Sequence, residues 1–381
     1  MSNMQGSRTI PFQFQGNAIE YFKIWIVNIT LSILTLGIYS AWAKVRTKRY
    51  FYGNTLLDGS SFEYLANPLS ILQGRFIVLG VVLIYVACVQ VFPILEPAFF
   101  FIYIIALPWI VIKSLQFNTR NSSYRNIRFN FDGKLLEAAY ILIGLFILTL
   151  VTFGLAFPYF IKRLNQFSIE HSYFGKSKFS IQATTGAYFK IYLKILIIPI
   201  IGIIAAIAIP AYQTYIENAQ LANQSPTPII EQEIEIQPET LPPITTPPQN
   251  QTLDTLDPTL AIFAGLLPMI LSLAFYIFIW VYIQTRIANL VYNNTNLDVH
   301  TFQSSMRVRD MFWLHFVNII ATIVSLGLLI PWAKIRIARY RATHLTLHTT
   351  GKISDFVANE QMNVKATAAE FADALDVDLG F

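Results

Sequence analysis

Four runs of about 20 apolar residues restrict what this chain can fold into. They cover residues 76–95, 98–117, 191–212 and 258–283, and none has a charged residue in its middle. A helix needs about 20 apolar residues to cross the hydrocarbon core of a bilayer. The composition agrees, because 54% of the residues are hydrophobic and only 13% are charged, which is not typical of a soluble domain. The sequence therefore predicts an integral membrane protein.

Three further apolar runs, at 22–43, 139–160 and 312–333, each contain a glycine about two-thirds of the way along. The first continues as "TLGIYSAWAKVRTKRY" and the last as "SLGLLIPWAKIRIARY", and the two align without a gap at an offset of 290 residues. A weaker middle copy aligns with the first at an offset of 117. Internal periodicity of this kind indicates duplication.

Short strands flank these segments. The stretches "FQFQG" and "IRFNFDG" alternate apolar and polar residues, and "YGNTLLDGSSF" at 52–62 returns as "YNNTNLDVHTF" at 292–302. Such patterns with Asp-Gly or Asn-rich punctuation predict strands joined by turns. We therefore expect three units of strand, hydrophobic hairpin, basic helix and strand, at 10–62, 127–179 (degenerate) and 292–348. The predicted fold class is an α-helical multi-pass membrane protein with internal repeats and short cytoplasmic β-strands around glycine-broken hairpins.

The charge distribution predicts which loops face the cytoplasm. Residues 195–285 contain no Lys or Arg, whereas 213–257 contain seven acidic residues. Because short cytoplasmic loops are enriched in Lys and Arg, we expect 213–257 to be an acidic, Pro-rich extracytoplasmic loop. The remaining loops, both termini and a tail at 349–381 are then expected in the cytoplasm.

The glycine-containing segments allow two interpretations. Each has basic residues on both flanks, so a single crossing would place one basic flank outside. If the helix breaks at Gly37, Gly154 and Gly327, each segment instead enters the bilayer and returns on the same side. The alternative is that 24–43 is one 20-residue span with a tolerated glycine. The hairpin interpretation is preferred because it places every basic loop in the cytoplasm.

The basic arms of the first and last segments are candidate lipid-contact sites. Trp is enriched at membrane interfaces, and clustered Lys and Arg attract anionic headgroups. Arg46 and Arg49 are three residues apart and share a helix face, as do Arg336 and Arg339. The predicted headgroup or interfacial anchor residues are Trp42, Lys44, Arg46, Arg49, Trp332, Lys334, Arg336 and Arg339. We expect anionic membrane lipids as partners and no nucleic acid; plain positive-inside anchoring is the alternative.

Catalytic patterns are missing from the sequence. There is no glycine-rich phosphate loop, nucleophile elbow, cysteine pair or His-Glu-x-x-His motif. We therefore expect no enzyme, no cofactor and no metal site. The function classes that stay open are transport, a channel or lipid handling, and alternatively a non-catalytic scaffold or sensor that binds partners through its loops.

Residues 200–220, "IIGIIAAIAIPAYQTYIENAQ", resemble the N-terminal helix of type IV pilins. The pilin processing site would need a glycine before Phe189 and a glutamate at 193, where this chain has Tyr188 and Leu193. Processing as a pilin is therefore not expected. The resemblance implies that the chain leaves the membrane beyond this helix on the outer side.

Motifs over most of the chain outside 213–257 resemble the YjgN family of bacterial inner-membrane proteins, which carry a domain of unknown function. They are the N-terminal F-x-F-x-G, "EYFKIWIVN" at 20–28, "TLGIYSAWAKVRTKRYFYGNT" at 35–55 and Gly-Arg at 74–75. The resemblance implies an inner-membrane location and no assigned activity.

Overall fold

The computed structural model describes residues 7–223, 258–351 and 353–362. The chain divides into two units, one made of residues 1–192 and 280–381 and the other of residues 193–279. The second unit holds the later part of helix α8 (Thr185–Asn223) and the first part of α9 (Pro258–Asn293).

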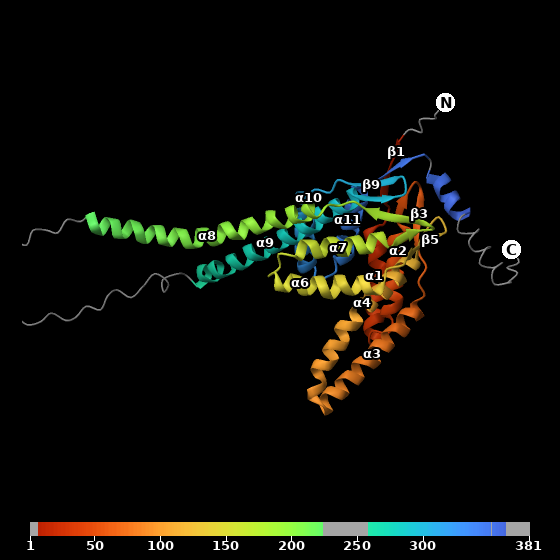
Figure 1. Cartoon of the computed structure of the whole chain (residues 1–381), viewed down its shortest axis with the longest axis horizontal. Helices are drawn as coiled ribbons and strands as arrows, with labels where there is room; N and C mark the ends of the chain where they lie inside the picture. Colours follow the sequence, from red (N-terminus) through yellow and green to blue (C-terminus); the bar gives the residue numbers. More distant parts are fainter. Residues whose placement is uncertain (1–6, 224–257, 352, 363–381) are drawn as a thin grey trace, which may run out of the picture. The chain divides into compact units, whose positions relative to one another are not determined.

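Ten antiparallel strands of the first unit close into a barrel (Figure 1). The strands are β1 (Ser7–Phe14), β2 (Thr55–Leu57), β3 (Ser60–Tyr64), β4 (Ser122–Tyr124), β5 (Ile127–Phe131), β6 (Ser172–Phe174), β7 (Ser177–Ile181), β8 (Thr295–Leu297), β9 (His300–Ser304) and β10 (Leu345–Thr350). Neighbours in this order pair with each other, and β1 pairs with both β2 and β10. Closure leaves no strand edge unpaired, which removes the edges through which sheets aggregate.

Tight turns join the strands in pairs. The turn between β4 and β5 consists of Arg125 and Asn126, and the turn between β2 and β3 consists of Asp58 and Gly59. All four residues have positive φ. Positive φ at both central residues suits the twist of a two-residue hairpin. Arg125 also donates to the backbone oxygen of Asp58 at 2.9 Å and to Ser60 Oγ at 2.9 Å, which ties the two turns together.

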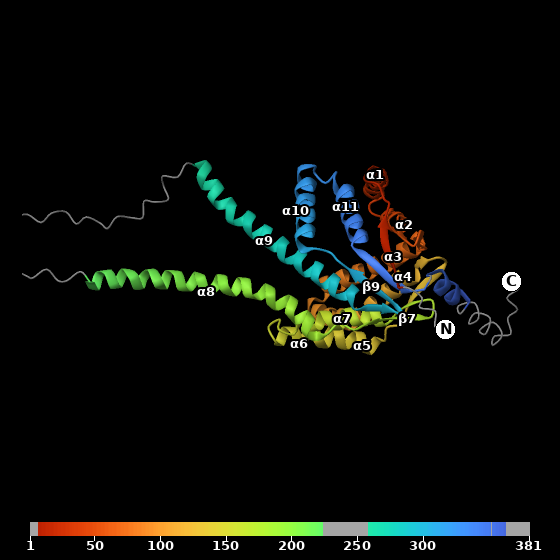
Figure 2. The same ribbon diagram turned by 90° about the horizontal axis from the view of Figure 1, so that it is seen from above.

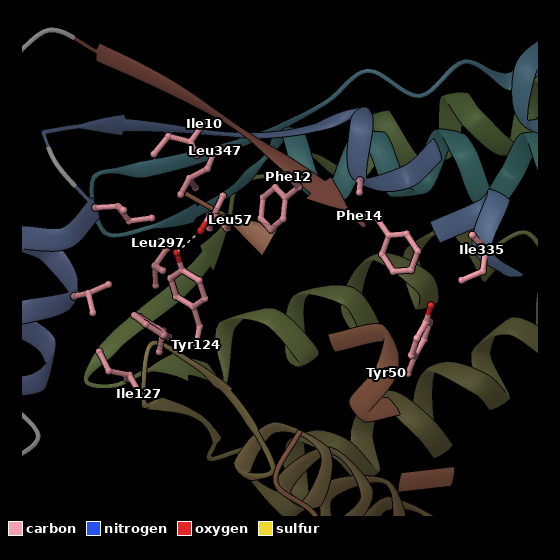
Figure 3. Packing of buried hydrophobic residues seen from close by; sticks show 14 of the residues in the cluster. Ile10, Phe12, Phe14, Tyr50, Leu57, Tyr124, Ile127, Leu297, Ile335 and Leu347 are labelled. Atoms are coloured by element: carbon pink, nitrogen blue, oxygen red, sulfur yellow. Dashed lines mark hydrogen bonds between the residues drawn. The ribbon is translucent and has the colours of Figure 1, made fainter. Parts of the chain in front are cut away.

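Alternating apolar residues fill the inside of the barrel. In β1, Ile10, Phe12 and Phe14 are buried, while the residues between them are exposed. Figure 3 shows Leu57, Tyr124, Leu297 and Leu347 gathered from four different strands. The two-residue period of a strand thus puts one set of side chains into a common core.

Helices run into the strands. The helices of this unit are α1 (Ala18–Leu34), α2 (Ser40–Gly53), α3 (Pro68–Val91), α4 (Glu96–Arg120), α5 (Leu135–Ala139), α6 (Phe146–Val151), α7 (Phe157–Glu170), α10 (Val308–Val324) and α11 (Ile330–Thr343), with the ends of α8 and α9 and a short helix at residues 353–362. A 3₁₀ turn (Pro93–Leu95) precedes α4, and a π-helical stretch (Tyr140–Leu145) joins α5 to α6. Helices α2, α4, α7, α9 and α11 each end two residues before a strand begins. In Figure 2, α10 and α11 lie side by side.

Three described helical segments are long and apolar enough to cross a membrane: Pro68–Val91, Pro93–Arg120 and Ser272–Asn293. The first two correspond to the predicted runs 76–95 and 98–117, and the third overlaps 258–283. The predicted run 191–212 falls within α8. Most of the predicted acidic loop 213–257 and residues 363–381 of the predicted tail lie outside the described residues.

The predicted fold class is wrong. The strands are not a minor layer beside a helical multi-pass bundle, because they close into a ten-stranded barrel that holds the largest buried cluster of the described residues. The error has a physical reason. Each strand is only 3–8 residues long, and the pairing that closes the barrel joins residues as far apart in the chain as Ser7 and Thr350. Local sequence patterns indicate that such strands exist but not which of them pair.

Candidate functional site

The chain reverses between α1 and α2 at a turn that recurs twice. Helices α1, α6 and α10 end at Leu34, Val151 and Val324, and the next helices start at Ser40, Phe157 and Ile330. In the first turn the Gly37 amide donates to the Ser32 oxygen at 2.7 Å. The matching bonds are Gly154 to Thr149 at 2.7 Å and Gly327 to Thr322 at 2.8 Å. The three predicted breaks thus each end one helix and redirect the chain.

Left-handed backbone conformations explain why a glycine is needed in these turns. Gly37 has φ of 91°, Gly154 of 86° and Gly327 of 91°, a region that other residues enter only with strain. The hydroxyl residue two positions earlier fastens the next helix: Thr35 Oγ1 accepts from the Tyr39 amide at 2.9 Å, and Ser325 Oγ accepts from the Leu329 amide at 3.0 Å. Local sequence alone therefore accounts for the turn.

Large apolar side chains cover the tips of these turns without being buried. Leu36, Phe153 and Leu326 precede the three glycines, and they are 95%, 97% and 94% exposed. A water-soluble protein rarely exposes apolar residues at every tip of one recurring feature. These tips suit an apolar surrounding.

A groove of about 530 Å³ lies where α1 and α2 meet α11. Its walls contain the cations Lys44, Lys48 and Lys334 and the apolar residues Trp25, Ile29 and Ile33. Lys44 and Lys334 are exposed, although they are far apart in the sequence. The groove thus combines positive charge with an apolar wall. This combination is complementary to an anionic lipid, which has a negative headgroup and an apolar acyl chain.

An unpartnered amide oxygen also lines the groove. The Asn28 side chain is 5% exposed, and its Nδ2 lies 3.5 Å from the Ala43 oxygen. Its Oδ1 has no hydrogen-bond partner among the described residues. Because a buried acceptor without a donor is unfavourable, this oxygen suits a ligand that carries a hydrogen-bond donor.

Lys48 is the most enclosed cation of the groove. Its Nζ donates to Asn118 Oδ1 at 2.6 Å and lies 4.6 Å from the centroid of the Tyr64 ring. Burial lowers the pKa of Lys48, and the charge of Lys44 lowers it further. A nearby anion would offset both effects, because it favours the charged form of an amine.

The other predicted anchor residues have different surroundings. Arg49 donates to the backbone oxygens of Tyr64 and Ala66, both at 3.2 Å, and Arg339 donates to the Gly16 oxygen at 3.0 Å. These two arginines bind protein, so the predicted pairing of Arg46 with Arg49 and of Arg336 with Arg339 as headgroup clamps does not match their contacts. Arg46 is exposed and has no hydrogen bond or ion pair among the described residues.

The tryptophans of the two basic arms also differ. Trp42 stacks on Tyr39, with centroids 6.2 Å apart. Trp332 lies 4.4 Å from the guanidinium carbon of Arg336, and Arg336 also donates to Asn318 Oδ1 at 3.0 Å. Arg336 is thus held by the last hairpin itself.

The middle hairpin carries its positive charge against an acid. Arg163 lies 3.6 Å from Glu137, and His171 Nε2 lies 3.3 Å from the other oxygen of the same carboxylate. This arrangement leaves the arm of α7 less available to an external anion than the arm of α2.

Lys48, Trp25 and Asn28 are not among the predicted anchor residues, although Lys48 lies on the same basic helix as Lys44, which was expected among the lipid headgroups. Lys44 and Lys48 are four residues apart, a spacing that places them on one helix face, so this pair could have been found. Asn28 is a polar residue within the apolar run 22–43, but that its oxygen lacks a hydrogen-bond partner depends on the position of Arg46. Lys334 was predicted, whereas its place beside Lys44 depends on the contact between α1 and α11.

Comparison with known proteins agrees on one family. The model of a family described as "Bacterial protein of unknown function (DUF898)" matches residues 9–374. The inner membrane protein YjgN of Salmonella typhimurium is 26% identical over 376 residues, which covers 86% of each chain. The YjgN proteins of Escherichia coli O157:H7 and K12 are 30% and 32% identical over 152 and 127 residues, covering 38% and 32% of this chain and 37% and 31% of those proteins. No solved structure matches.

The comparisons confirm the predicted family and, through the names of the relatives, the inner-membrane location. They assign no activity. The match over nearly the whole chain leads to one conclusion: this chain belongs to the DUF898 family of bacterial proteins, and its relatives include the inner membrane proteins named YjgN.

Proposed function

We propose that this protein is a non-enzymatic lipid-handling protein of the inner membrane, and that the groove between α1, α2 and α11 binds the headgroup of an anionic lipid. The observation that carries the proposal is that Lys44, Lys48 and Lys334 line one groove together with an apolar wall and with Asn28, whose Oδ1 has no hydrogen-bond partner among the described residues. A phosphate would lie among the lysines, and an acyl chain would follow Trp25 and Ile33.

The open acceptor selects among anionic lipids. A phosphatidylglycerol headgroup carries both a phosphate and hydroxyl donors, so it can meet the lysines and the Asn28 oxygen together. Phosphatidylethanolamine carries an ammonium, which the three lysines would repel. We therefore expect phosphatidylglycerol to bind more tightly than phosphatidylethanolamine. Transport, channel activity and scaffolding have no comparable feature among the described residues.

The binding test uses the full chain in detergent and native mass spectrometry with phosphatidylglycerol. We expect the double variant Lys44→Gln/Lys334→Gln to weaken binding roughly 30-fold, because each cation near an anionic surface contributes about 1 kcal/mol. Lys134 and Lys190 are exposed lysines elsewhere in the unit, so Lys134→Gln/Lys190→Gln is the control of equal charge. Equal binding by the two double variants would exclude the groove as the headgroup site.

The same proposal includes an arrangement in the membrane. The apolar tips Leu36, Phe153 and Leu326 enter the bilayer and return as re-entrant hairpins, and the candidate spans cross it more than once. Both termini then lie in the cytoplasm, in agreement with the basic loops. The support is the exposure of the three tips together with the turn geometry at each glycine.

Spin labels test the hairpins directly. In a Cys88→Ser background, single cysteines at positions 36, 153 and 326 would be labelled in liposomes, with Glu63→Cys as a control on the barrel. We expect the three tips to be accessible to oxygen and shielded from a water-soluble nickel chelate, and the control to show the reverse. Full access of the chelate to the tips would contradict the re-entrant arrangement.

A further inference from the structure

The barrel encloses a cavity of about 660 Å³ to which all ten strands contribute. The inside of an eight-stranded barrel is just filled by side chains, and the diameter grows with strand number, so ten strands leave internal space. Pockets of roughly 300–1,000 Å³ are typical of small-molecule sites. The cavity is therefore large enough to hold a ligand.

Aromatic and aliphatic side chains form a belt around this cavity. Five phenylalanines stand in register with apolar residues of the next strand: Phe12 with Leu57, Phe62 with Tyr124, Phe129 with Phe174, Phe179 with Leu297 and Phe302 with Leu347. Adjacent phenylalanines stack, as Phe179 does on Phe129 and Phe302 with centroids 6.3 Å apart. The described lining contains no Lys, Arg, Asp or Glu. Such a wall favours a hydrocarbon chain.

Hydroxyl groups near the helix ends of the barrel are already satisfied. Ser122, Ser172 and Thr295 donate to the helix carbonyls four residues earlier, at 2.7–2.8 Å. They leave no strong demand for a polar ligand at that end.

His300 is the exception in the lining. It is 2% exposed, and neither ring nitrogen has a hydrogen-bond partner among the described residues. Burial lowers the pKa of His300, although the nearby Asp298 raises it, so the ring is neutral near pH 7. A neutral imidazole offers one donor and one acceptor, which complements a hydroxyl or a carboxylic acid.

A short C-terminal helix, residues 353–362, covers the cavity beside His300. Ile353, Phe356 and Val357 line the cavity, and the Phe356 ring meets the His300 ring edge-on with centroids 4.5 Å apart. Glu360 fastens this helix by accepting from the Lys176 amide at 2.6 Å and from Ser177 Oγ at 2.8 Å. The covered position keeps water away from the imidazole.

A second cavity of about 520 Å³ adjoins the first, since both are lined by Phe12, Tyr52, Phe62, Tyr292 and Leu345. Its walls add Met306 and Met311 and the ends of α9 and α11. Gln284 and Arg341 are polar residues in its lining, whereas His300 lines only the first cavity. The two cavities together extend the space beside the phenylalanine belt.

We propose that the barrel interior binds a single-chain lipid with a carboxylic acid or hydroxyl end, which hydrogen-bonds His300 while the chain runs along the phenylalanine belt. This site is separate from the groove of α1, α2 and α11 and does not depend on the function proposed for it.

The test uses the full chain in a steroid-based detergent, which lacks a linear chain, with palmitic acid and 1-hexadecanol as probes in native mass spectrometry. We expect saturable binding of one molecule of either probe. His300→Phe removes the hydrogen bond and should weaken both about fivefold to tenfold. Phe302→Trp fills part of the space and should weaken both at least about tenfold.

Two controls keep the outcomes distinct. Lys44→Gln/Lys334→Gln should leave 1-hexadecanol binding unchanged, because the uncharged alcohol gives the groove lysines no anion to bind, and this separates the barrel site from the groove. A photoactivatable palmitic acid on the unsubstituted protein should label residues 297–302 or 353–357, and this measurement does not depend on the folding of a variant. Labels confined to other segments, absence of saturable binding, or binding unchanged by both barrel substitutions would overturn the proposal.

Discussion

The first and last helix hairpins have nearly the same sequence around their turns but differ in how they hold their arginine. In the last hairpin, Arg336 donates to Asn318 Oδ1 at 3.0 Å and lies against Trp332. In the first hairpin, Arg46 points to solvent and Asn28 Oδ1 stays open. The same two residue types therefore give a closed network in one place and an open acceptor in the other.

The neighbours of each tryptophan account for the difference. Tyr39 stacks on Trp42, whereas Leu329 stands at the matching position of the last hairpin. Ser40 bonds to the guanidinium of Arg75 on α3, where the last hairpin has Ile330. These contacts engage the arm of α2 on both sides. Similar sequences thus need not produce similar sites, because the packing around them decides which polar groups stay open.

The largest effect on stability is expected from a substitution that breaks the closed network around Arg336. Arg336→Gln should lower the free energy of unfolding by about 1.5–3 kcal/mol, because a hydrogen bond from a charged group is lost and the Asn318 oxygen is left buried without its donor. Arg46→Gln, the matched control, should change it by less than about 0.5 kcal/mol, as exposed substitutions usually do. Chemical unfolding in mixed micelles measures both. Equal effects would mean that the two hairpins do not differ as described.

The turn glycines test a feature that the two hairpins share, a positive φ at the turn. Gly37→Ala and Gly327→Ala should each destabilise by about 1–2 kcal/mol, because alanine is strained at positive φ. A steric clash is not the cause. No atom lies within 4 Å of the Cβ that an alanine would add at Gly37, and at Gly327 the only such atom is Ile330 Cδ1, at 3.5 Å. Gly53, which has open space and no positive φ, serves as the control, and Gly53→Ala should be neutral or stabilising. The same unfolding assay applies, and a clear loss at Gly53 would argue against strain as the cause.

The hydroxyl groups of Thr35 and Ser325 within the turns allow a test of the same local structure, with a smaller expected effect on stability. Thr35→Val and Ser325→Ala should each lower the free energy of unfolding by about 1 kcal/mol, because the backbone amides of Tyr39 and Leu329 lose their hydrogen-bond acceptor. Differential scanning calorimetry would compare them with Thr301→Val on β9, an exposed strand threonine. If the losses of unfolding free energy in Thr35→Val and Ser325→Ala differ by more than about 1 kcal/mol, the two turns are not equivalent.

The smallest effect on stability is expected at the open acceptor. Asn28→Leu should change the free energy of unfolding by no more than about 0.5 kcal/mol, because it removes an unpartnered oxygen together with only a long hydrogen bond at 3.5 Å. Asn318→Leu should be clearly destabilising, since Arg336 then loses its acceptor. Lipid binding would show the opposite order, with the larger loss of phosphatidylglycerol affinity in Asn28→Leu. Equal binding losses would contradict a lipid donor at Asn28.

Parts of the candidate site could be predicted because they depend on nearby residues. The turns at Gly37, Gly154 and Gly327 follow from a hydroxyl residue, an apolar residue and a glycine in sequence, whose hydrogen bonds span at most five positions. Lys44 and Lys334 were predicted from their place after a tryptophan. The groove could not be predicted, because it requires α11 to pack beside α1. The contacts of the two arginines could not be predicted either, because Arg49 donates to the Tyr64 oxygen and Arg339 to the Gly16 oxygen of distant segments.

The sequence by itself determined the family, the membrane setting, the two apolar helices α3 and α4, and the three turns, because hydrophobic length and local hydrogen bonding act over short distances along the chain. Only the tertiary structure decided that ten short strands close into a barrel, that Lys44 and Lys334 share a groove, and that His300 is buried with no hydrogen-bond partner among the described residues. These features depend on pairing and packing between segments hundreds of residues apart, for which a short strand or a single lysine carries no local signal.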